Sequence, residues 1–236
     1  MITSVTISGA DDSVKPKDLL ELNKEFPFVE WGILLSRKQA GNFRYPSRAW
    51  LEELYNYLFQ LKLSGHLCGS YVRELLNGDE TFIRDFGSLW TMFERIQINF
   101  YGLPQVVDST KMIDLLLLFE EKEFIFQIDN INNHLIKEAY EAGVNCSALF
   151  DLSHGTGVLP SEWPLPFEKI RCGYAGGLSS ENLKDQIFII EQRVGDTNVW
   201  IDMESHVRSN NDSLFDLSKA RKCLEISSSA IVREPY

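Results

Sequence analysis

The sequence has few cysteines and no pair of them at a short spacing. Its 236 residues contain four, which lie far apart: Cys68, Cys146, Cys172 and Cys223. Neither a zinc knuckle, which needs closely spaced ligands, nor the dense disulfide framework of a small secreted domain is indicated. Such cysteine usage is typical of a protein in a reducing compartment, and we expect a cytoplasmic location.

Long apolar runs are also absent. The longest, LLLLF at 115–119, is far shorter than the roughly 20 residues that a membrane-spanning helix needs. The first ten residues, MITSVTISGA, have no basic region and no long apolar stretch, so they do not match a signal peptide. We therefore expect no membrane partner.

Positive charge is scarce and is not gathered into blocks. The formal net charge is −11, so a nucleic-acid backbone would be repelled rather than bound. A small anionic or phosphorylated ligand is still compatible with this charge, because helix N-termini and backbone N–H groups can hold a phosphate inside an acidic protein. Nucleic acid is thus excluded as a partner, whereas a small phosphorylated substrate is not.

Short β-type runs recur along the chain, and stretches with helical periodicity separate them. A hydrophobic content of 44% and a charged content of 24% are those of an ordinary globular protein that can bury a sizeable core. We predict eight strands, at 4–8, 28–35, 64–68, 95–100, 123–128, 147–151, 170–174 and 198–202.

Helices are predicted in most of the gaps, at 16–25, 47–62, within 69–94, and at 108–122, 131–143, 179–195 and 216–226. The gap after the sixth strand differs, because Pro160, Pro164 and Pro166 disfavour a regular helix there. Strict alternation of strand and helix predicts a parallel sheet, most simply one (β/α)₈ TIM barrel over residues 1–236 with an irregular sixth unit. An open, doubly wound sheet is the alternative.

Polar residues gather toward the C-terminal ends of the predicted strands. Residues i and i+2 share one face of a strand, and barrel enzymes carry their chemistry at the C-terminal end. The candidate pocket residues are His66, Cys68, Asn99, Gln127, Asp129 and Asp202. A second interpretation stays open for the two aspartates, which are equally well placed to cap the following helices.

Three segments together resemble phosphoribosylanthranilate isomerase, an enzyme of tryptophan biosynthesis. They are GILLSRKQAGNFRYPS at 32–47, FDLSHGTG at 150–157 and AGGLSSENL at 175–183. A fourth, IQINFYG at 96–102, is similar to the Gln-Leu-His-Gly of that family but lacks the histidine. The resemblance spans most of the chain, and Ala-Gly-Gly-Leu is its most specific part, although related phosphate-binding barrels share it.

The resemblance implies an Amadori-type isomerisation, which converts a phosphorylated aminoaldose into an aminoketose. By the family pattern, Asp151 is the general acid and Arg44 binds the carboxylate of an anthranilate-type substrate. The implied phosphate cup consists of Gly155, Gly157, Gly176, Gly177, Ser205 and His206, where His206 replaces a glycine of the family and brings a Cβ close to the phosphate. The helix that opens near Ser179 would add free N–H groups and a positive dipole end. A tight turn that needs two glycines is the alternative explanation for 176–177.

One position departs from the family in a way that bears on catalysis. The family has a strand-one cysteine as general base, and Ser8 stands in its place. A serine hydroxyl is too weakly acidic to act as a base without a partner. Either another group is the base, with Asp11, Asp12 and the Cys68–His66 pair as candidates, or the reaction differs, or the barrel only binds a ligand. If only the base is missing, Ser8→Cys should gain activity.

The sequence analysis therefore predicts a phosphoribosylanthranilate isomerase-like barrel whose catalytic candidates are Asp151 and Ser8. A different sugar-phosphate isomerase or lyase with Asp151 as base, and a non-catalytic ligand-binding barrel, are the alternatives. We predict no cofactor, and no metal site because Asp151, His154, Asp202 and Glu204 form no short ligand motif. A monomer and a homodimer are both compatible with the sequence.

Overall fold

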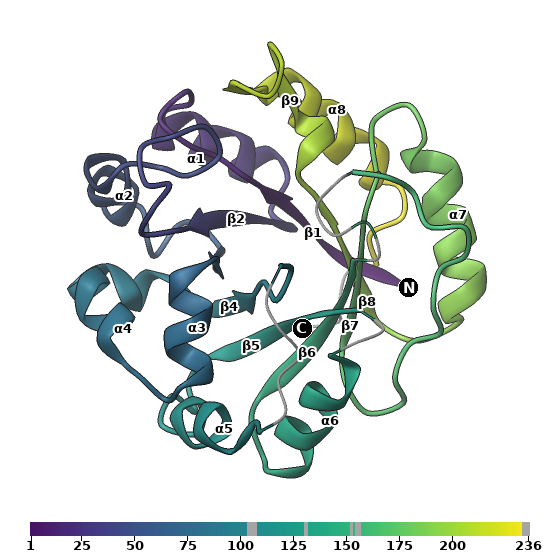
Figure 1. Cartoon of the computed structure of the whole chain (residues 1–236). Coiled ribbons are helices and arrows are strands. Elements are labelled where there is room, and N and C mark those ends of the chain that lie inside the picture. The colour runs from purple at the N-terminus through teal and green to yellow at the C-terminus, as the bar shows by residue number, and fades with distance from the viewer. Residues whose placement is uncertain (103–107, 130–131, 152, 154–156, 233–236) are drawn as a thin grey trace.

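Eight parallel strands form the centre of the molecule and close into a barrel (Figure 1). The computed structural model describes residues 1–102, 108–129, 132–151, 153 and 157–232. Each strand pairs with the next along the chain, and β8 pairs with β1. The strands are β1 (Ile2–Ser8), β2 (Val29–Leu35), β3 (Leu63–Leu67), β4 (Arg95–Ile98), β5 (Glu123–Ile128), β6 (Cys146–Asp151), β7 (Cys172–Ala175) and β8 (Val199–Met203). The predicted barrel and its eight strands are confirmed.

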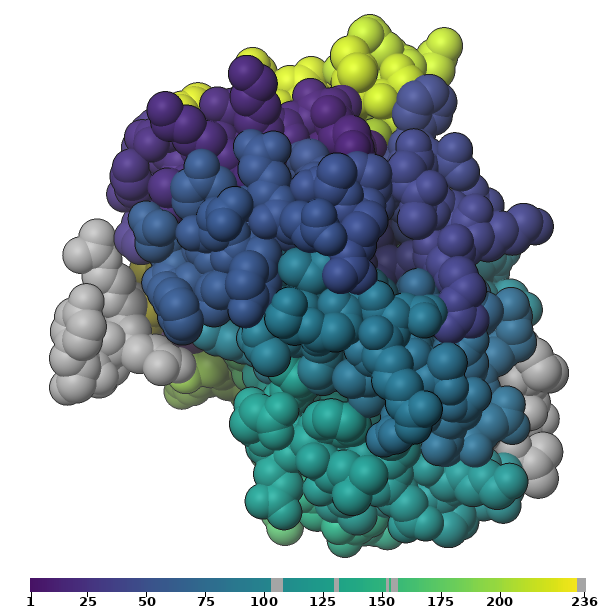
Figure 2. Space-filling view, turned by 90° about the vertical axis from the view of Figure 1, so that its left-hand side faces the viewer, coloured from purple at the N-terminus to yellow at the C-terminus, as the bar shows by residue number. Residues whose placement is uncertain are grey.

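Helices surround the barrel, as Figure 1 shows. They are α1 (Pro16–Glu25), α2 (Arg48–Tyr55), α3 (Ser70–Leu76), α4 (Thr81–Phe86), the 3₁₀ helix η1 (Gly87–Met92), α5 (Thr110–Leu116), α6 (Asn133–Glu141), α7 (Leu183–Val194), the 3₁₀ helix η2 (Ser205–Val207) and α8 (Leu217–Ser227). A small hairpin of β9 (Arg208–Ser209) and β10 (Leu214–Phe215) precedes α8. In Figure 2 the colour changes gradually over the outer wall, because consecutive strand–helix units are neighbours in space.

Three predicted helices are clearly shorter than expected, and one of them, predicted over 108–122, is limited to Thr110–Leu116. The helix predicted over 47–62 begins with Ser47 as its N-cap and ends at Tyr55. Beyond Tyr55 the chain continues in tight turns, in which the N–H groups of Tyr57 and Gln60 donate to carbonyls three residues back. The helix predicted from 179 begins only at Leu183. Between β6 and β7 the described residues contain no helix, as the three prolines predicted.

Apolar side chains are buried in two separate places. The larger group fills the space between the sheet and the helices and includes Trp31, Phe124 and Tyr174. The smaller lies inside the barrel and consists of Ile125, Leu149, Ala175 and Trp200. Because successive side chains of a strand point to opposite faces, the strands β5 to β8 each contribute to both groups. The barrel interior is therefore only partly apolar, which leaves space for polar groups.

A buried ion cluster occupies the barrel interior near the N-terminal ends of the strands. Arg95 donates to Glu30 Oε1 over 3.0 Å and to Glu123 Oε1 over 2.9 Å, and its guanidinium lies 4.3 Å from the centre of the Trp200 ring. Thr6 Oγ1 donates to Glu30 over 2.9 Å. These contacts satisfy charges that would be costly to bury alone. The cluster forms a floor beneath the polar layers toward the C-terminal ends.

No helix among the described residues has the length and apolar character that crossing a membrane requires.

Candidate active site

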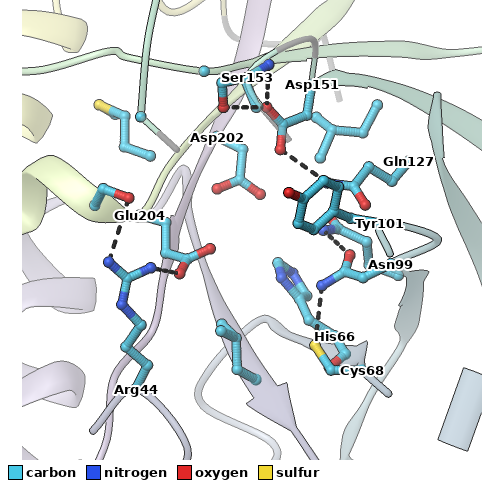
Figure 3. A pocket seen from close by; sticks show the side chains of 18 of the residues that line it. Arg44, His66, Cys68, Asn99, Tyr101, Gln127, Asp151, Ser153, Asp202 and Glu204 are labelled. Carbon is cyan, nitrogen blue, oxygen red and sulfur yellow. Dashed lines mark hydrogen bonds and ion pairs between the residues drawn. The ribbon is translucent and has the colours of Figure 1, made fainter. Parts of the chain in front are cut away.

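A cavity of about 390 Å³ opens at the C-terminal ends of the strands (Figure 3). The predicted pocket is therefore present, and its lining is mainly polar. Side chains reach it from the ends of most of the strands and from the loops that follow β2, β6, β7 and β8. Among the lining residues are Arg44, Tyr45, His66, Cys68, Gln97, Asn99, Tyr101, Gln127, Asp151, Ser153, Gly157, Gly176, Gly177, Asp202, Glu204, Ser205 and His206.

Asp151 is the last residue of β6, and its carboxylate is held on both oxygens. Oδ1 accepts hydrogen bonds from Ser153 N over 3.1 Å and from Ser153 Oγ over 2.6 Å. Oδ2 accepts from Gln127 Nε2 over 2.9 Å. The contacts with Ser153 are those of an Asx turn, which ends the strand. Asp151 is thus a turn former and a cavity residue at once, and its carboxylate is an acceptor in every one of these bonds.

Asp202 projects from β8 into the same cavity and is almost completely buried. Its Oδ1 accepts a hydrogen bond from Ser8 Oγ over 2.9 Å. Burial, together with the charges of Glu204, Glu30 and Asp151, holds the pKa of Asp202 well above its usual range, although the bond from Ser8 opposes this shift. Asp202 therefore keeps its proton to a higher pH than an ordinary aspartate does.

Beneath Asp202, the side chains of Ser8 and His66 lie so close to β2 that only a glycine fits there. A Cβ at Gly32 of β2 would collide with Ser8 Oγ and with the imidazole of His66, so only glycine fits between these two side chains. Ser8 itself is buried below Asp202 and does not line the cavity. The residue at the position of the family cysteine thus contacts an acid instead of opening to the ligand.

Glu204 enters the cavity directly after β8 and pairs with Arg44. Arg44 Nη1 donates to Glu204 and Arg44 Nε to Asp212. Both Arg44 and its acidic partners are only partly exposed. Burial raises the pKa of Glu204, and the charge and hydrogen bond of Arg44 oppose that shift. Figure 3 shows the carboxyl groups of Asp151, Asp202 and Glu204 all pointing into one space.

Neutral hydrogen-bonding groups line the side formed by β3, β4 and β5. Gln97 Nε2 donates to Asn99 Oδ1 over 2.8 Å, and Asn99 Nδ2 donates to Cys68 Sγ over 3.2 Å. Among the described residues, no group donates to the buried oxygens Gln97 Oε1 and Gln127 Oε1. Buried amide oxygens normally accept a hydrogen bond, so a ligand or a water molecule can donate to these two atoms.

The Cys68–His66 pair does not have the properties of a thiolate base. Burial raises the pKa of Cys68 to about 12 and lowers that of His66 to about 3, so both are neutral at physiological pH. His66 Nε2 lies 3.0 Å from Ser64 Oγ, and Cys68 Sγ lies 3.5 Å from the carbonyl oxygen of His66. The two residues line the cavity as uncharged polar groups.

Two other candidate bases are engaged elsewhere. Asp11 accepts from Arg208 Nη2 over 2.7 Å and from the backbone N–H of Arg44 over 2.6 Å. Asp12 is exposed and accepts from Ser47 N over 2.7 Å. Neither lines the cavity. Both carboxylates instead fix the ends of loops around the mouth of the barrel.

The glycines after β7 have a packing role that is visible in the structure. A Cβ on Gly177, which has a φ of 70°, would meet the backbone of Leu159. Among the described residues, nothing accepts a hydrogen bond from the backbone N–H of Gly177 or of Ser205, and both residues line the cavity. The turn therefore requires glycine at position 177, and within the described part of the chain the N–H groups of Gly177 and Ser205 remain available to a ligand.

The phosphate cup implied by the resemblance is partly described. Gly157, Gly176, Gly177, Ser205 and His206 all line the cavity, whereas Gly155 and His154 lie outside the described residues. His206 is exposed, and its Nε2 lies 2.9 Å from the carbonyl oxygen of Gly157, so it links the loop after β8 to the loop after β6.

Two expectations about individual groups need correction. Asp129 does not line the cavity, because its carboxylate accepts from Asn132 N over 2.9 Å and thereby shapes the turn that leads into α6. The N–H of Ser179 is not open to a phosphate, because it donates to Asn182 Oδ1 over 2.9 Å and α7 begins only at Leu183.

Sequence reasoning did not assign Tyr45, Tyr101 or Ser153 to the site, and it placed Glu204 in the loop of the phosphate cup without a role in proton transfer. Tyr45 and Tyr101 lie in loops whose paths no sequence pattern reveals. A signal was available for the others, because Ser153 follows a strand-end aspartate at the spacing of an Asx turn and Glu204 continues the alternation of Asp202 by two residues. The described residues contain no group of His, Cys, Asp and Glu side chains arranged to hold a metal ion.

Comparison with known proteins identifies the fold. No family model and no curated protein matches the sequence. N-(5'-phosphoribosyl)anthranilate isomerase from Pyrococcus furiosus is 14% identical with a TM-score of 0.60, over 96% of this chain and 99% of that one. Dimeric phosphoribosylanthranilate isomerase from Thermotoga maritima, crystallised as monomers, is 15% identical with a TM-score of 0.57, over 96% and 98%. KGPDC from Streptococcus mutans is 12% identical with a TM-score of 0.55, over 97% and 99%. At such identities the likeness establishes the TIM barrel alone.

Proposed function

We propose that this barrel catalyses the isomerisation of a phosphorylated aldose or aminoaldose to the corresponding ketose, an Amadori-type reaction. The observation that carries this proposal is a pair of carboxyl groups in contrasting environments within one cavity. Asp151 is surrounded by hydrogen-bond donors, whereas Asp202 is buried among other acids. The raised pKa of Asp202 suits a proton donor, and the hydrogen bonds that Asp151 accepts orient its carboxyl oxygens in the same cavity.

The roles follow from these environments. Asp202, which keeps its proton, donates it to the ring oxygen as the C1–O bond breaks and the aminoaldose opens to an iminium ion. A simple aldose opens in the same way to the protonated aldehyde and then passes through an enediol. Asp151 takes the proton from C2, and the C–H electrons form the C1=C2 bond of an enaminol. Asp202 then regains a proton from the enol hydroxyl while Asp151 returns its own to C1, which leaves the ketose and both acids in their starting states.

This assignment differs from the one that the resemblance implies, in which Asp151 is the general acid. Ser8 supports the change. Its hydroxyl donates to Asp202 and orients that carboxyl group from below. In our proposal Ser8 on β1 is a positioning residue. Asp202, on the neighbouring strand β8, is the group at this place that transfers a proton. No thiolate is then required.

The phosphate end of the substrate is proposed to lie at the loops after β7 and β8. The open N–H groups of Gly177 and Ser205 suit an anion, since backbone N–H groups bind phosphate without a positive side chain. Barrel enzymes also commonly place a phosphate after strands seven and eight. The acid pair then lies on β6 and β8, on either side of β7.

The direct test is to measure ketose formation by ¹³C NMR. Ribose 5-phosphate, alone and with ammonia to form the aminoaldose, is incubated with the wild type and with Asp151→Asn and Asp202→Asn. We expect ketose from the wild type and rates lower by about 10²- to 10⁴-fold in each variant. Asp114→Asn, which removes an exposed carboxylate on α5, is the matched control and should match the wild type. No ketose above the protein-free rate would contradict the proposal and favour a non-catalytic barrel.

A further inference from the structure

The cavity has one cationic side chain among its described lining residues, and that side chain is already neutralised. Within the part of the chain that the structure describes, Arg44 is the only lysine or arginine that lines the cavity. Its Nη1 donates to Glu204, its Nε donates to Asp212, and its Nη2 lies 3.5 Å from Ser205 Oγ. All three nitrogens of the guanidinium thus already face an oxygen. A substrate carboxylate at Arg44 would therefore lie beside the carboxyl groups of Glu204 and Asp212, which already offset the charge of the guanidinium.

Arg44 is also held in place from behind. Its backbone has a φ of 72°, outside the usual range for arginine, and its N–H donates to Asp11 Oδ2 over 2.6 Å. Asp11 in turn pairs with the fully buried Arg208, which reaches Asp212 Oδ1 over 3.2 Å. Positive and negative groups therefore alternate from Glu204 through Arg44, Asp212 and Arg208 to Asp11. Such a network fixes each member, so Arg44 is not free to swing toward a ligand.

Several other polar groups of the cavity are hydrogen-bond acceptors that a ligand with donor groups could satisfy. Asp151 and Glu204 present carboxylate oxygens, and the buried oxygens Gln97 Oε1 and Gln127 Oε1 have no donor among the described residues. Gln97 is only 5% exposed. Acceptor oxygens outnumber free cations among the described lining residues, so a ligand carboxylate would meet like charge and acceptor oxygens.

We propose that, apart from its phosphate, the substrate is a polyol or amino-polyol that offers hydroxyl or ammonium donors and carries no carboxylate. The inference rests on the proposed function, because it specifies the substrate of that same site. It contradicts the role that the resemblance implies for Arg44, which was to bind an anthranilate-type carboxylate. In this structure Arg44 instead orients the carboxyl group of Glu204 and offsets its negative charge.

Four phosphorylated probes test the inference by isothermal titration calorimetry on the full chain. They are ribitol 5-phosphate, 1-amino-1-deoxyribitol 5-phosphate, and the N-phenyl and N-(2-carboxyphenyl) derivatives of the latter. The last two differ only in the carboxylate. We expect the amine to bind at least as tightly as ribitol 5-phosphate, and the carboxyphenyl probe to bind at least about tenfold more weakly than its phenyl counterpart.

Variants then test whether Arg44 is the cause. Asp212→Asn and Glu204→Gln each remove one negative charge that pairs with the Arg44 guanidinium. In both variants, the dissociation constants of the carboxyphenyl and phenyl probes should differ less than in the wild type. Asp85→Asn removes an exposed carboxylate that pairs with Arg37, and neither residue lines the cavity, so this variant should leave the ratio of the two constants unchanged. Thermal unfolding of each variant establishes that it is folded before binding is compared.

The outcomes separate the inference from the proposed function. Equal or tighter binding of the carboxyphenyl probe overturns the inference and leaves the isomerase proposal intact. A ratio that neither Asp212→Asn nor Glu204→Gln changes overturns it as well, because the selectivity would then not come from Arg44. Failure of all four probes to bind overturns both, since a phosphorylated polyol is required by each.

Discussion

Replacing Asp202 with asparagine should make the protein more stable, and increasingly so as the pH rises. Asparagine has nearly the same shape, and its Oδ1 can still accept the hydrogen bond from Ser8 that Asp202 Oδ1 accepts over 2.9 Å. What the substitution removes is a carboxyl group that folding buries among other acids. Burial is the main cause of its raised pKa, and the charges of Glu204, Glu30 and Asp151 add to it.

The sign of the effect follows from proton linkage. A carboxyl group whose pKa is higher in the folded than in the unfolded state favours folding fully below its unfolded pKa. This contribution is lost as the pH rises from that value, about 3.9, through the folded pKa. Each unit by which folding raises the pKa costs about 1.4 kcal/mol of stability at high pH. Asp202→Asn should therefore lose less stability than the wild type across this window, and the difference should level off above the folded pKa.

Urea unfolding from pH 4 to pH 9 measures this difference. The wild type, Asp202→Asn and the control Asp114→Asn are compared at each pH by the free energy of unfolding. Asp114 is exposed on α5, so its removal should shift the curve little and without a trend. If the curves of wild type and Asp202→Asn run parallel across the whole range, Asp202 is not a carboxyl group with a strongly raised pKa, and its assignment as the acid is refuted.

Three further substitutions test other parts of the account. Ser8→Cys should lower kcat and shift the pH–rate profile rather than create activity, because the hydroxyl orients Asp202; a gain in rate would support a missing thiolate base instead. Gly177→Ala should lower the stability by at least about 1–3 kcal/mol in thermal unfolding, because its positive φ is strained for alanine and the new Cβ meets Leu159; an unchanged melting temperature would contradict the packing role. Arg95→Met should cost about 3–5 kcal/mol in urea unfolding, since it leaves the buried carboxyl group of Glu30 without its ion-pair partner and removes the nearer of the two arginines beside Glu123; a smaller loss would mean that water reaches Glu30.

The barrel was predictable because its signal is local and repeated. Each strand and each helix leaves its own periodicity in the sequence, and eight alternations specify the topology. Helix ends were less predictable, because they depend on contacts that no periodicity shows. The helix after Ser47 ends at Tyr55 although apolar residues continue, and the bond from Ser179 N to Asn182 Oδ1 delays the start of α7.

The site was predictable only in part, for a physical reason. Alternation along a strand places Asp151, Asp202 and Gln127 on the inner face, and the cavity contains all three. Partners that come from distant loops leave no such pattern. The pairing of Arg44 with Glu204 spans 160 positions and depends on how two loops meet above the barrel. For that reason the sequence suggested a free arginine, and the structure contains a neutralised one.

The central claim, that Asp151 and Asp202 transfer protons within one isomerisation, is tested most directly with an aldose phosphate deuterated at C2. The rate of ketose formation is measured for labelled and unlabelled substrate with the wild type and with Asp151→Asn. We predict that the wild type turns over the labelled substrate several-fold more slowly and that Asp151→Asn forms almost no ketose. Equal rates of ketose formation by the wild type and Asp151→Asn would contradict the account, because C2 would then lose its proton to another group.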